Sequence, residues 1–272
     1  MCFVLHSLAM RILMLFAMTA VIGGAVALAD PYGPPHAVTD MAPFCASCHA
    51  STSVEQLPDL RPEIAKAETI EEKHLKFIET DAAYKDLAAA QRQSLINAIQ
   101  WIDAHARVSI TGPVRAKRNS RIEVMVVTKG GAGPVIGLSL VDSLVRFQAR
   151  PISSSGFKVL GPPMVIGPDH KAQADWIDRR VRGSELSLST IMITGIHGDA
   201  ETQQLSETRT TWNLRTPAEP GVYRIAVAFY YGTEKAHPLG TVIRNGRPEP
   251  RGGLNGPSGR IMFSSLLSIT VI

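Results

Sequence analysis

The chain has 272 residues, of which 45% are hydrophobic and 19% are charged, an ordinary globular composition with room for one or two cores. Its formal net charge of +4 is too small to argue for nucleic-acid binding. The three cysteines are Cys2, Cys45 and Cys48. Because Cys45 and Cys48 are too close in sequence to close a useful loop, a fold built on disulfides is excluded.

The N-terminal residues have the pattern of an export signal. Arg11 is the only charged residue before Asp30, and the apolar run that follows it ends on Ala27-Leu28-Ala29, a typical cleavage site. We therefore expect residues 1–29 to be a signal peptide, and the mature protein to be periplasmic or extracellular with no stable membrane span. The alternative is an uncleaved membrane anchor, because residues 12–29 are just long enough to cross a bilayer.

Two helices are predicted after a proline-rich lead-in at residues 30–44. Thr69 and Glu72 form a capping-box pattern at the start of the first helix, and the second is expected from about residue 86 to residue 106. The apolar stripe of the first helix consists of Ile70, His74, Phe77 and Ile78, and that of the second consists of Leu95, Ile99 and Ile102. Trp101 lies off the second stripe, so it is a candidate for packing on a neighbouring group.

After Arg107 the helical pattern gives way to short β-rich runs separated by Gly, Pro and Ser. The predicted strands are residues 121–128, 135–141, 145–150, 157–160, 186–196, 208–214, 221–231 and 260–271. Short strands at this spacing are typical of a two-sheet sandwich. The expected fold class is α+β with two domains: a small all-α domain at residues 30–106 and an all-β, immunoglobulin-like sandwich at residues 107–272, with the boundary near residues 107–118.

The strongest motif is Cys45-Ala46-Ser47-Cys48-His49. Two thiols two residues apart can add to the two vinyl groups of a haem, and the next residue supplies an imidazole to the iron. We therefore predict one covalent haem c, anchored by Cys45 and Cys48 with His49 as the proximal ligand. Two alternatives stay open, a redox dithiol of thioredoxin type and a zinc ribbon. The dithiol motif usually follows a strand, and no strand is predicted before Cys45. A zinc ribbon would need a second pair of Cys or His ligands at a suitable spacing, which is absent.

The motif, the residues after it and the helical pattern up to Ala106 resemble a short class I cytochrome c. The resemblance implies an N-terminal CxxCH helix packed on a C-terminal helix, with a methionine as the sixth iron ligand. This chain departs from the family because no methionine occurs between His49 and Met125. The other candidate ligands in the mature chain are His36, Met41, His74, His105, His170, His197 and His237.

We favour His74 as the distal ligand, because it interrupts an apolar stripe and a histidine facing a core needs a polar partner. His74 could also be an ordinary half-exposed helix residue. His105 is the second candidate, although a histidine in a last helical turn is already stabilised by the helix dipole. A bis-histidine iron bound by His49 and His74 would have no open position, which favours electron transfer with a redox partner protein over catalysis.

The β-rich region resembles, loosely, the reelin-like sandwich domains of some secreted bacterial proteins. The resemblance covers about residues 120–232 and depends on Gly156-Phe157, Thr211-Trp212 and the turn from Pro217 to Gly221. It implies a binding or assembly role without identifying a ligand. A second interpretation follows, in which the sandwich is the functional part and the haem is a sensor or a structural element.

Three further patterns carry less information. Residues 244–259 include Arg244, Arg247 and Arg251, and could dock an acidic partner, although a solvated hairpin connection is favoured. The polar clusters at Asp169-His170, Asp175, Asp178 and His197-Gly198-Asp199 are possible metal contacts but also ordinary turn sequences. Because no nucleophile elbow, phosphate loop or metalloprotease helix is present, the sequence does not predict an enzyme.

Overall fold

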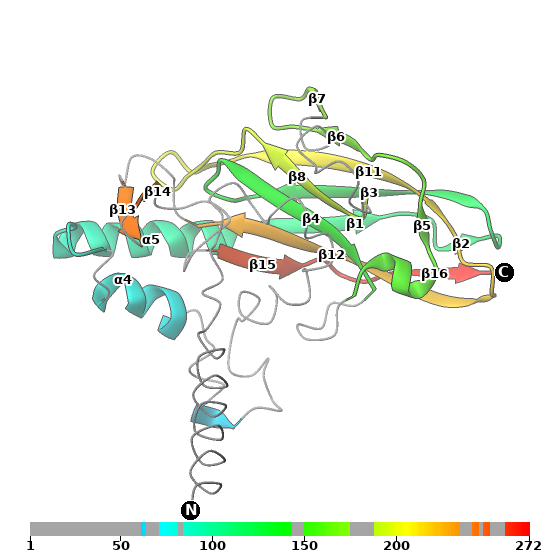
Figure 1. Cartoon of the computed structure of the whole chain (residues 1–272), viewed down its shortest axis with the longest axis horizontal. Helices are drawn as coiled ribbons and strands as arrows, with labels where there is room; N and C mark the ends of the chain where they lie inside the picture. Colours follow the sequence, from blue (N-terminus) through cyan, green and yellow to red (C-terminus); the bar gives the residue numbers. More distant parts are fainter. Residues whose placement is uncertain are drawn as a thin grey trace, which may run out of the picture.

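Two β-sheets pack face to face in the computed structural model of this protein (Figure 1). The structure describes residues 61–63, 71–80, 84–142, 150–174, 188–233, 241–244, 247–250 and 259–272. Almost all strand pairs in it are antiparallel, as in a β-sandwich. The sandwich predicted for the C-terminal part of the chain is therefore confirmed.

The first sheet has β3 (Arg121–Lys129) and β11 (Glu207–Arg215) at its centre. Its other strands are β1 (Arg107–Thr111) beside β3, and β5 (Lys158–Val159), β6 (Met164–Ile166) and β7 (Ala172–Gln173) on the far side of β11. A 3₁₀ turn, η4 (Ile152–Ser155), precedes β5, and a small hairpin of β9 (Gly198–Asp199) and β10 (Gln204–Leu205) precedes β11.

The second sheet is organised around the long strand β12 (Gly221–Gly232). Its other strands are β2 (Arg115–Ala116), β16 (Leu267–Val271), β15 (Gly259–Phe263), β4 (Val135–Val141) and β8 (Thr190–Thr194). Residues 221–225 of β12 pair with β16 and residues 228–232 pair with β15, while β4 lies on the other side. The hairpin β13 (Thr241–Arg244) and β14 (Arg247–Pro250) comes between β12 and β15 in sequence.

Alternating residues of the two sheets fill the space between them. On β11 the inward residues include Trp212, which is fully buried and whose indole Nε1 donates to the carbonyl oxygen of Leu188 at 2.9 Å. On β12 the inward residues include Val227 and Phe229, both fully buried. A buried indole with a satisfied N–H contributes a large apolar area at no polar cost, so Trp212 is a core residue.

One predicted strand, residues 260–271, is divided into β15 and β16. Ser264 causes the division, because its hydroxyl accepts from the backbone N–H of Val227 at 3.0 Å while its own N–H donates to the Val227 carbonyl at 2.9 Å. The side chain thus replaces a ladder bond at the junction. The predictions for residues 121–128, 135–141, 208–214 and 221–231 are confirmed, whereas most of 145–150 and the start of 186–196 lie outside the described residues.

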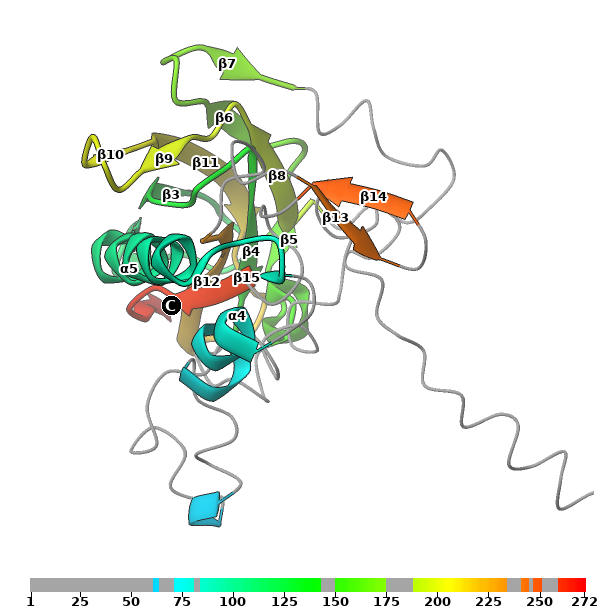
Figure 2. The same ribbon diagram turned by 90° about the vertical axis from the view of Figure 1, so that its left-hand side faces the viewer.

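The helical elements lie at one end of the sandwich (Figure 1), the end that faces the viewer in Figure 2. A π-helical turn, η2 (Glu71–Leu75), continues into α4 (Lys76–Thr80), and α5 (Ala89–His105) follows. The Gln91 side chain accepts the backbone N–H of Ala88 at 2.8 Å, which satisfies a donor just before α5. The helix predicted over residues 86–106 is confirmed with slightly narrower bounds, and its stripe of Leu95, Ile99 and Ile102 is buried.

Helix α5 runs into the sandwich without a linker. Only Ala106 separates α5 from β1; it is fully buried and belongs, with Ile102, to the core between the sheets. The predicted boundary at residues 107–118 coincides with β1 and β2, which are both strands of the sandwich. The division into two domains stays a prediction, but the last turn of α5 is physically part of the sandwich core.

A glycine contact fixes the hairpin of β9 and β10 close to the β3–β4 connection. A Cβ atom on Gly198 would lie 2.3 Å from the backbone oxygen of Gly131, whereas one on Gly221 would meet nothing closer than 3.4 Å. We expect Gly198→Ala to lower the free energy of unfolding by about 3 kcal/mol, because backbone must move. Urea unfolding measures the effect, and a loss as small as that of Gly221→Ala would contradict it.

Candidate functional site

The CxxCH motif, Cys45 to His49, lies outside the described residues, as do His36, Met41 and His237. His74 lies in η2, where the structure describes its backbone only. His105 is the last residue of α5. The capping residue Thr69 is also outside the described part. Of the two favoured distal ligands, the structure therefore places the backbone of His74 and the whole of His105; His170 and His197 are also described, both in the sandwich region.

The backbone around His74 is unusual. Residues Glu71–Leu75 form a π-helical turn before the chain tightens into the α-helix of α4. Such turns are rare and occur frequently at functional sites, because they shift side chains out of the regular helical register. Leu75, the next residue along the chain, and Ile78, about one helical turn further on, are buried. His74 is thus held on a short helix whose neighbouring positions are fixed by packing.

Helix α4 packs against α5 through an apolar cluster separate from the sandwich core. The cluster consists of Leu75, Ile78, Tyr84, Leu95, Ile96 and Ile99, with Phe77 and Leu87 at its edge. The rings of Phe77 and Tyr84 meet edge to face, with centroids 6.0 Å apart. This cluster gives the helical elements a small core of their own, next to the position of His74.

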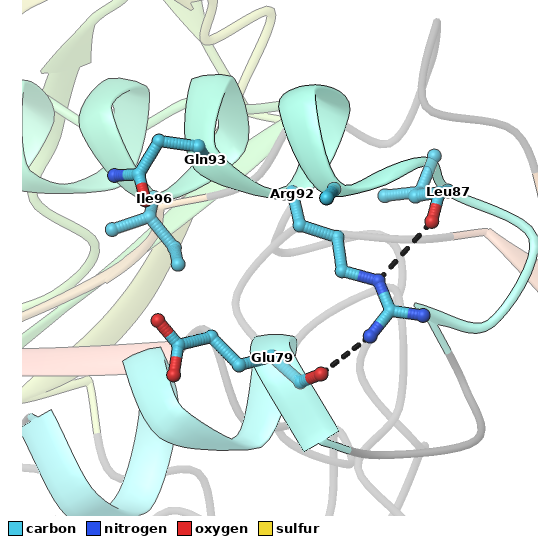
Figure 3. A pocket seen from close by; sticks show the side chains of 6 residues that line it. Glu79, Leu87, Arg92, Gln93 and Ile96 are labelled. Carbon is cyan, nitrogen blue, oxygen red and sulfur yellow. Dashed lines mark hydrogen bonds between the residues drawn. The ribbon is translucent and has the colours of Figure 1, made fainter.

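A cavity of about 400 Å³ opens between α4 and α5 (Figure 3). Its described lining consists of Glu79, Leu87, Ala89, Arg92, Gln93 and Ile96. Arg92 Nε donates to the carbonyl oxygen of Leu87 at 3.2 Å, and its Nη1 donates to the carbonyl oxygen of Glu79. Arg92 therefore connects the end of α4 to the start of α5, and its guanidinium donates to two backbone carbonyl oxygens, one of them in the last turn of α4.

His105 is exposed and stacks on Trp101, with ring centroids 4.4 Å apart and an angle of 25° between the rings. Its Nδ1 lies 2.7 Å from the carbonyl oxygen of Trp101. Since a carbonyl oxygen only accepts, Nδ1 carries the proton and Nε2 is the nitrogen that could bind a metal. Trp101 itself is half-buried and packs against the sandwich core, so it joins α5 to the sheets.

A buried polar network, which the sequence did not reveal, fixes α5 to the second sheet. Asp103 of α5 accepts from Arg260 Nε at 2.9 Å through Oδ2, and from the Tyr231 hydroxyl at 3.1 Å through Oδ1. The side chain of Arg260 is 3% exposed and that of Asp103 is 19% exposed. Because Tyr231 and Arg260 are opposite each other on β12 and β15, one carboxylate joins the helix to both strands.

Burial controls the electrostatics of this network. It raises the pKa of the Asp103 carboxyl above its ordinary value, against the opposing effects of the Arg260 charge and of the two hydrogen bonds. Burial also raises the pKa of Tyr231 well above its ordinary value, and the neighbouring Asp103 adds to the increase. Tyr231 is therefore a permanent hydrogen-bond donor, and the network functions as a structural connection.

The remaining polar clusters form turns. Asp169 accepts the backbone N–H of Lys171 at 3.1 Å, and His197 Nδ1 lies 3.3 Å from the carbonyl oxygen of Gly195. Asp175, Asp178 and Arg251 lie outside the described residues, while Arg244 and Arg247 are paired positions of the β13–β14 hairpin. Within the described ranges, no group of three or more His, Cys, Asp or Glu residues could hold a metal ion.

In the part of the chain that the structure describes, no helix combines the length and the apolar character needed to cross a membrane. Of the helical region predicted at residues 30–106, the structure describes mainly η2, α4 and α5 and the attachment of α5 to the sandwich. No protein-family model matches this chain, and no curated protein is similar enough to match it.

Proposed function

We propose that this protein is an exported c-type cytochrome with one covalent haem, and that it transfers single electrons to and from a redox partner protein in the periplasm or outside the cell. The observation that carries the proposal is the sequence Cys45 to His49 after an export signal. The thiols of Cys45 and Cys48 would hold the haem through thioether bonds, and His49 would bind the iron. The haem supplies a one-electron couple, and the proposal includes no enzymatic activity.

The described helices support this proposal. Residues 30–106 would form the cytochrome-like domain, and its last two elements, α4 and α5, pack through their own apolar cluster. A small helical core of this kind is what a short class I cytochrome c needs around its haem. The fully buried Ile78 and Ile99 belong to this cluster, so the pair of helices is a fixed frame.

His74 is the distal ligand in this proposal. No methionine is available between His49 and Met125, and the chain forms a π-helical turn at His74 before α4 begins. His105 remains the second candidate through its Nε2. Because two imidazoles stabilise ferric iron, the reduction potential should lie below that of cytochromes with a methionine ligand.

Reduction and oxidation of the purified protein, followed by visible absorption, test the proposed function. A cytochrome c of this kind should give a sharp α band on reduction and titrate as a one-electron couple. A protein without visible absorption that takes up two electrons at Cys45 and Cys48 would instead be a dithiol redox protein. This outcome would overturn the proposal.

We expect His74→Ala to convert the low-spin ferric spectrum into a high-spin spectrum, since the iron would lose its sixth ligand. Electron paramagnetic resonance and visible absorption of the oxidised protein would detect the change. The matched control is His105→Ala, which should leave the low-spin spectrum intact. If the two variants behave in the opposite way, His105 is the ligand and the assignment to His74 is wrong.

A further inference from the structure

The end of the sandwich opposite the helices is strongly basic. β12 starts there at Gly221 and reaches the α5 end at Tyr231, about 35 Å away for a strand of this length. Seven exposed basic residues gather at this end on both sheets and on the turn between β2 and β3. These residues, called the basic end below, are Arg115, Lys117, Arg118, Arg121, Lys158, Arg215 and Arg224.

The strand register places several of these charges directly side by side. Arg215 of β11 is opposite Arg121 of β3 on one side and opposite Lys158 of β5 on the other. Like charges in opposite positions repel one another and destabilise a sheet. The Arg121 guanidinium donates to the neutral side chain of Asn213, from Nη2 at 2.8 Å and from Nε at 3.0 Å. An arrangement that costs stability in the isolated protein suggests an anionic partner.

Carboxylates do not neutralise this charge in the described structure. Glu123 and Glu219 are the acidic residues nearest in sequence, and neither forms an ion pair with the basic end in the described part of the chain. By contrast, Arg150 is paired with Asp142 at 3.0 Å. The positive field at the basic end is therefore available to an external ligand.

Exposed aliphatic side chains lie among the charges. Val114, Val222 and Ile272 are 69%, 68% and 56% exposed. Thr270 connects them, because it is opposite Val222 on β12 and its N–H donates to the Val114 carbonyl at 2.9 Å. On the other side of β16, Thr270 pairs with Arg115 of β2. Basic and aliphatic residues are therefore neighbours on β2, β16 and β12 at this end of the sheet.

We propose that the basic end docks on a membrane surface rich in anionic phospholipids. Basic side chains contribute electrostatic attraction to such a surface, and small aliphatic groups add affinity by entering the interface. A specific protein partner would be expected to use aromatic anchors and pockets. In the described part of this end, the large exposed apolar residues are aliphatic. This inference concerns the sandwich and does not depend on the proposed haem.

Flotation of the purified full chain with vesicles tests the proposal. Vesicles of equal parts phosphatidylglycerol and phosphatidylcholine should carry the protein to the top of the gradient, whereas pure phosphatidylcholine should not, and added salt should release it. Since each basic residue near an anionic surface contributes about fivefold, the triple variant Arg115→Gln, Lys117→Gln, Arg118→Gln should lower the partition coefficient about 100-fold. Circular dichroism checks that the variant folds.

The matched control is the triple variant Lys129→Gln, Arg209→Gln, Lys171→Gln, which removes the same charge from exposed positions elsewhere on the sandwich. It should change the partition coefficient less than about tenfold. Equal losses in both triple variants, or equal binding to neutral vesicles, would overturn the proposal. Retention on an immobilised acidic protein or polysaccharide without vesicle binding would also overturn it, and would assign the basic end to a soluble polyanion.

Discussion

Replacement of both Cys45 and Cys48 by alanine is expected to give an exported protein that carries no covalent haem. The thioether bonds are the only covalent links between the proposed haem and the chain, so the loss should be complete. A peroxidase-based haem stain on a denaturing gel and the α band of the reduced protein measure it. The effect is all or none, because non-covalent haem is removed by denaturation.

The chain contains its own control for this experiment. Cys2 is the third cysteine, and it lies in the predicted signal peptide. Cys2→Ala should therefore leave the haem stain and the α band unchanged. If the double variant retains its visible spectrum, or if the parent protein shows none, the motif does not attach haem and the proposed function is wrong.

Replacement of Asp103 by alanine is expected to lower the free energy of unfolding by about 3 kcal/mol. The variant would leave the Arg260 guanidinium, which is 3% exposed, without the carboxylate that lies 2.9 Å from its Nε. It would also remove the acceptor of the Tyr231 hydroxyl. Urea unfolding followed by tryptophan fluorescence measures the loss, since Trp101 and Trp212 both pack in the core that α5 closes.

Two comparisons show whether this loss comes from the buried charge. The triple variant Asp103→Leu, Tyr231→Phe, Arg260→Met removes both charges and the buried hydroxyl and should recover most of the stability, because apolar groups of similar size need no counter-charge or acceptor. Lys76→Ala breaks the exposed pair with Glu72 and should cost much less stability than Asp103→Ala, because solvent screens an exposed pair. A triple variant as unstable as Asp103→Ala would show that helix packing, and not the buried polar network, causes the loss.

Much of the sandwich could be predicted because its central strands carry local signals. β12 is a run of β-branched and aromatic residues between Pro220 and Gly232, and β4 is a mainly apolar run that begins directly after Gly133-Pro134, so these limits follow from composition. Helix α5 was predictable from its apolar stripe. β1 was not, because its five residues begin one residue after a helix and include three polar side chains. Its strand conformation comes from pairing with β3.

The Asp103 network shows what sequence patterns cannot provide. Asp103 and Arg260 are separated by 157 positions, and Asp103 and Tyr231 by 128. Each residue alone is an ordinary member of its segment, an acid near a helix end, a tyrosine in a strand and an arginine at a strand start. Only the fold brings them together. The proposed haem motif is the opposite case, because Cys45, Cys48 and His49 lie within five consecutive residues and a chemistry for them can be proposed without a structure.

The direct passage from α5 through Ala106 into β1 has a consequence for how such a protein can evolve. A gene segment encoding residues 30–106 could not be exchanged for another helical unit in the way that tethered modules are, because Ile102 and Ala106 at the end of α5 belong to the sandwich core. The incoming helix would have to supply an acid at position 103 and small residues at its end. We therefore expect the end of α5 and the sandwich core that it contacts to constrain each other's sequence change.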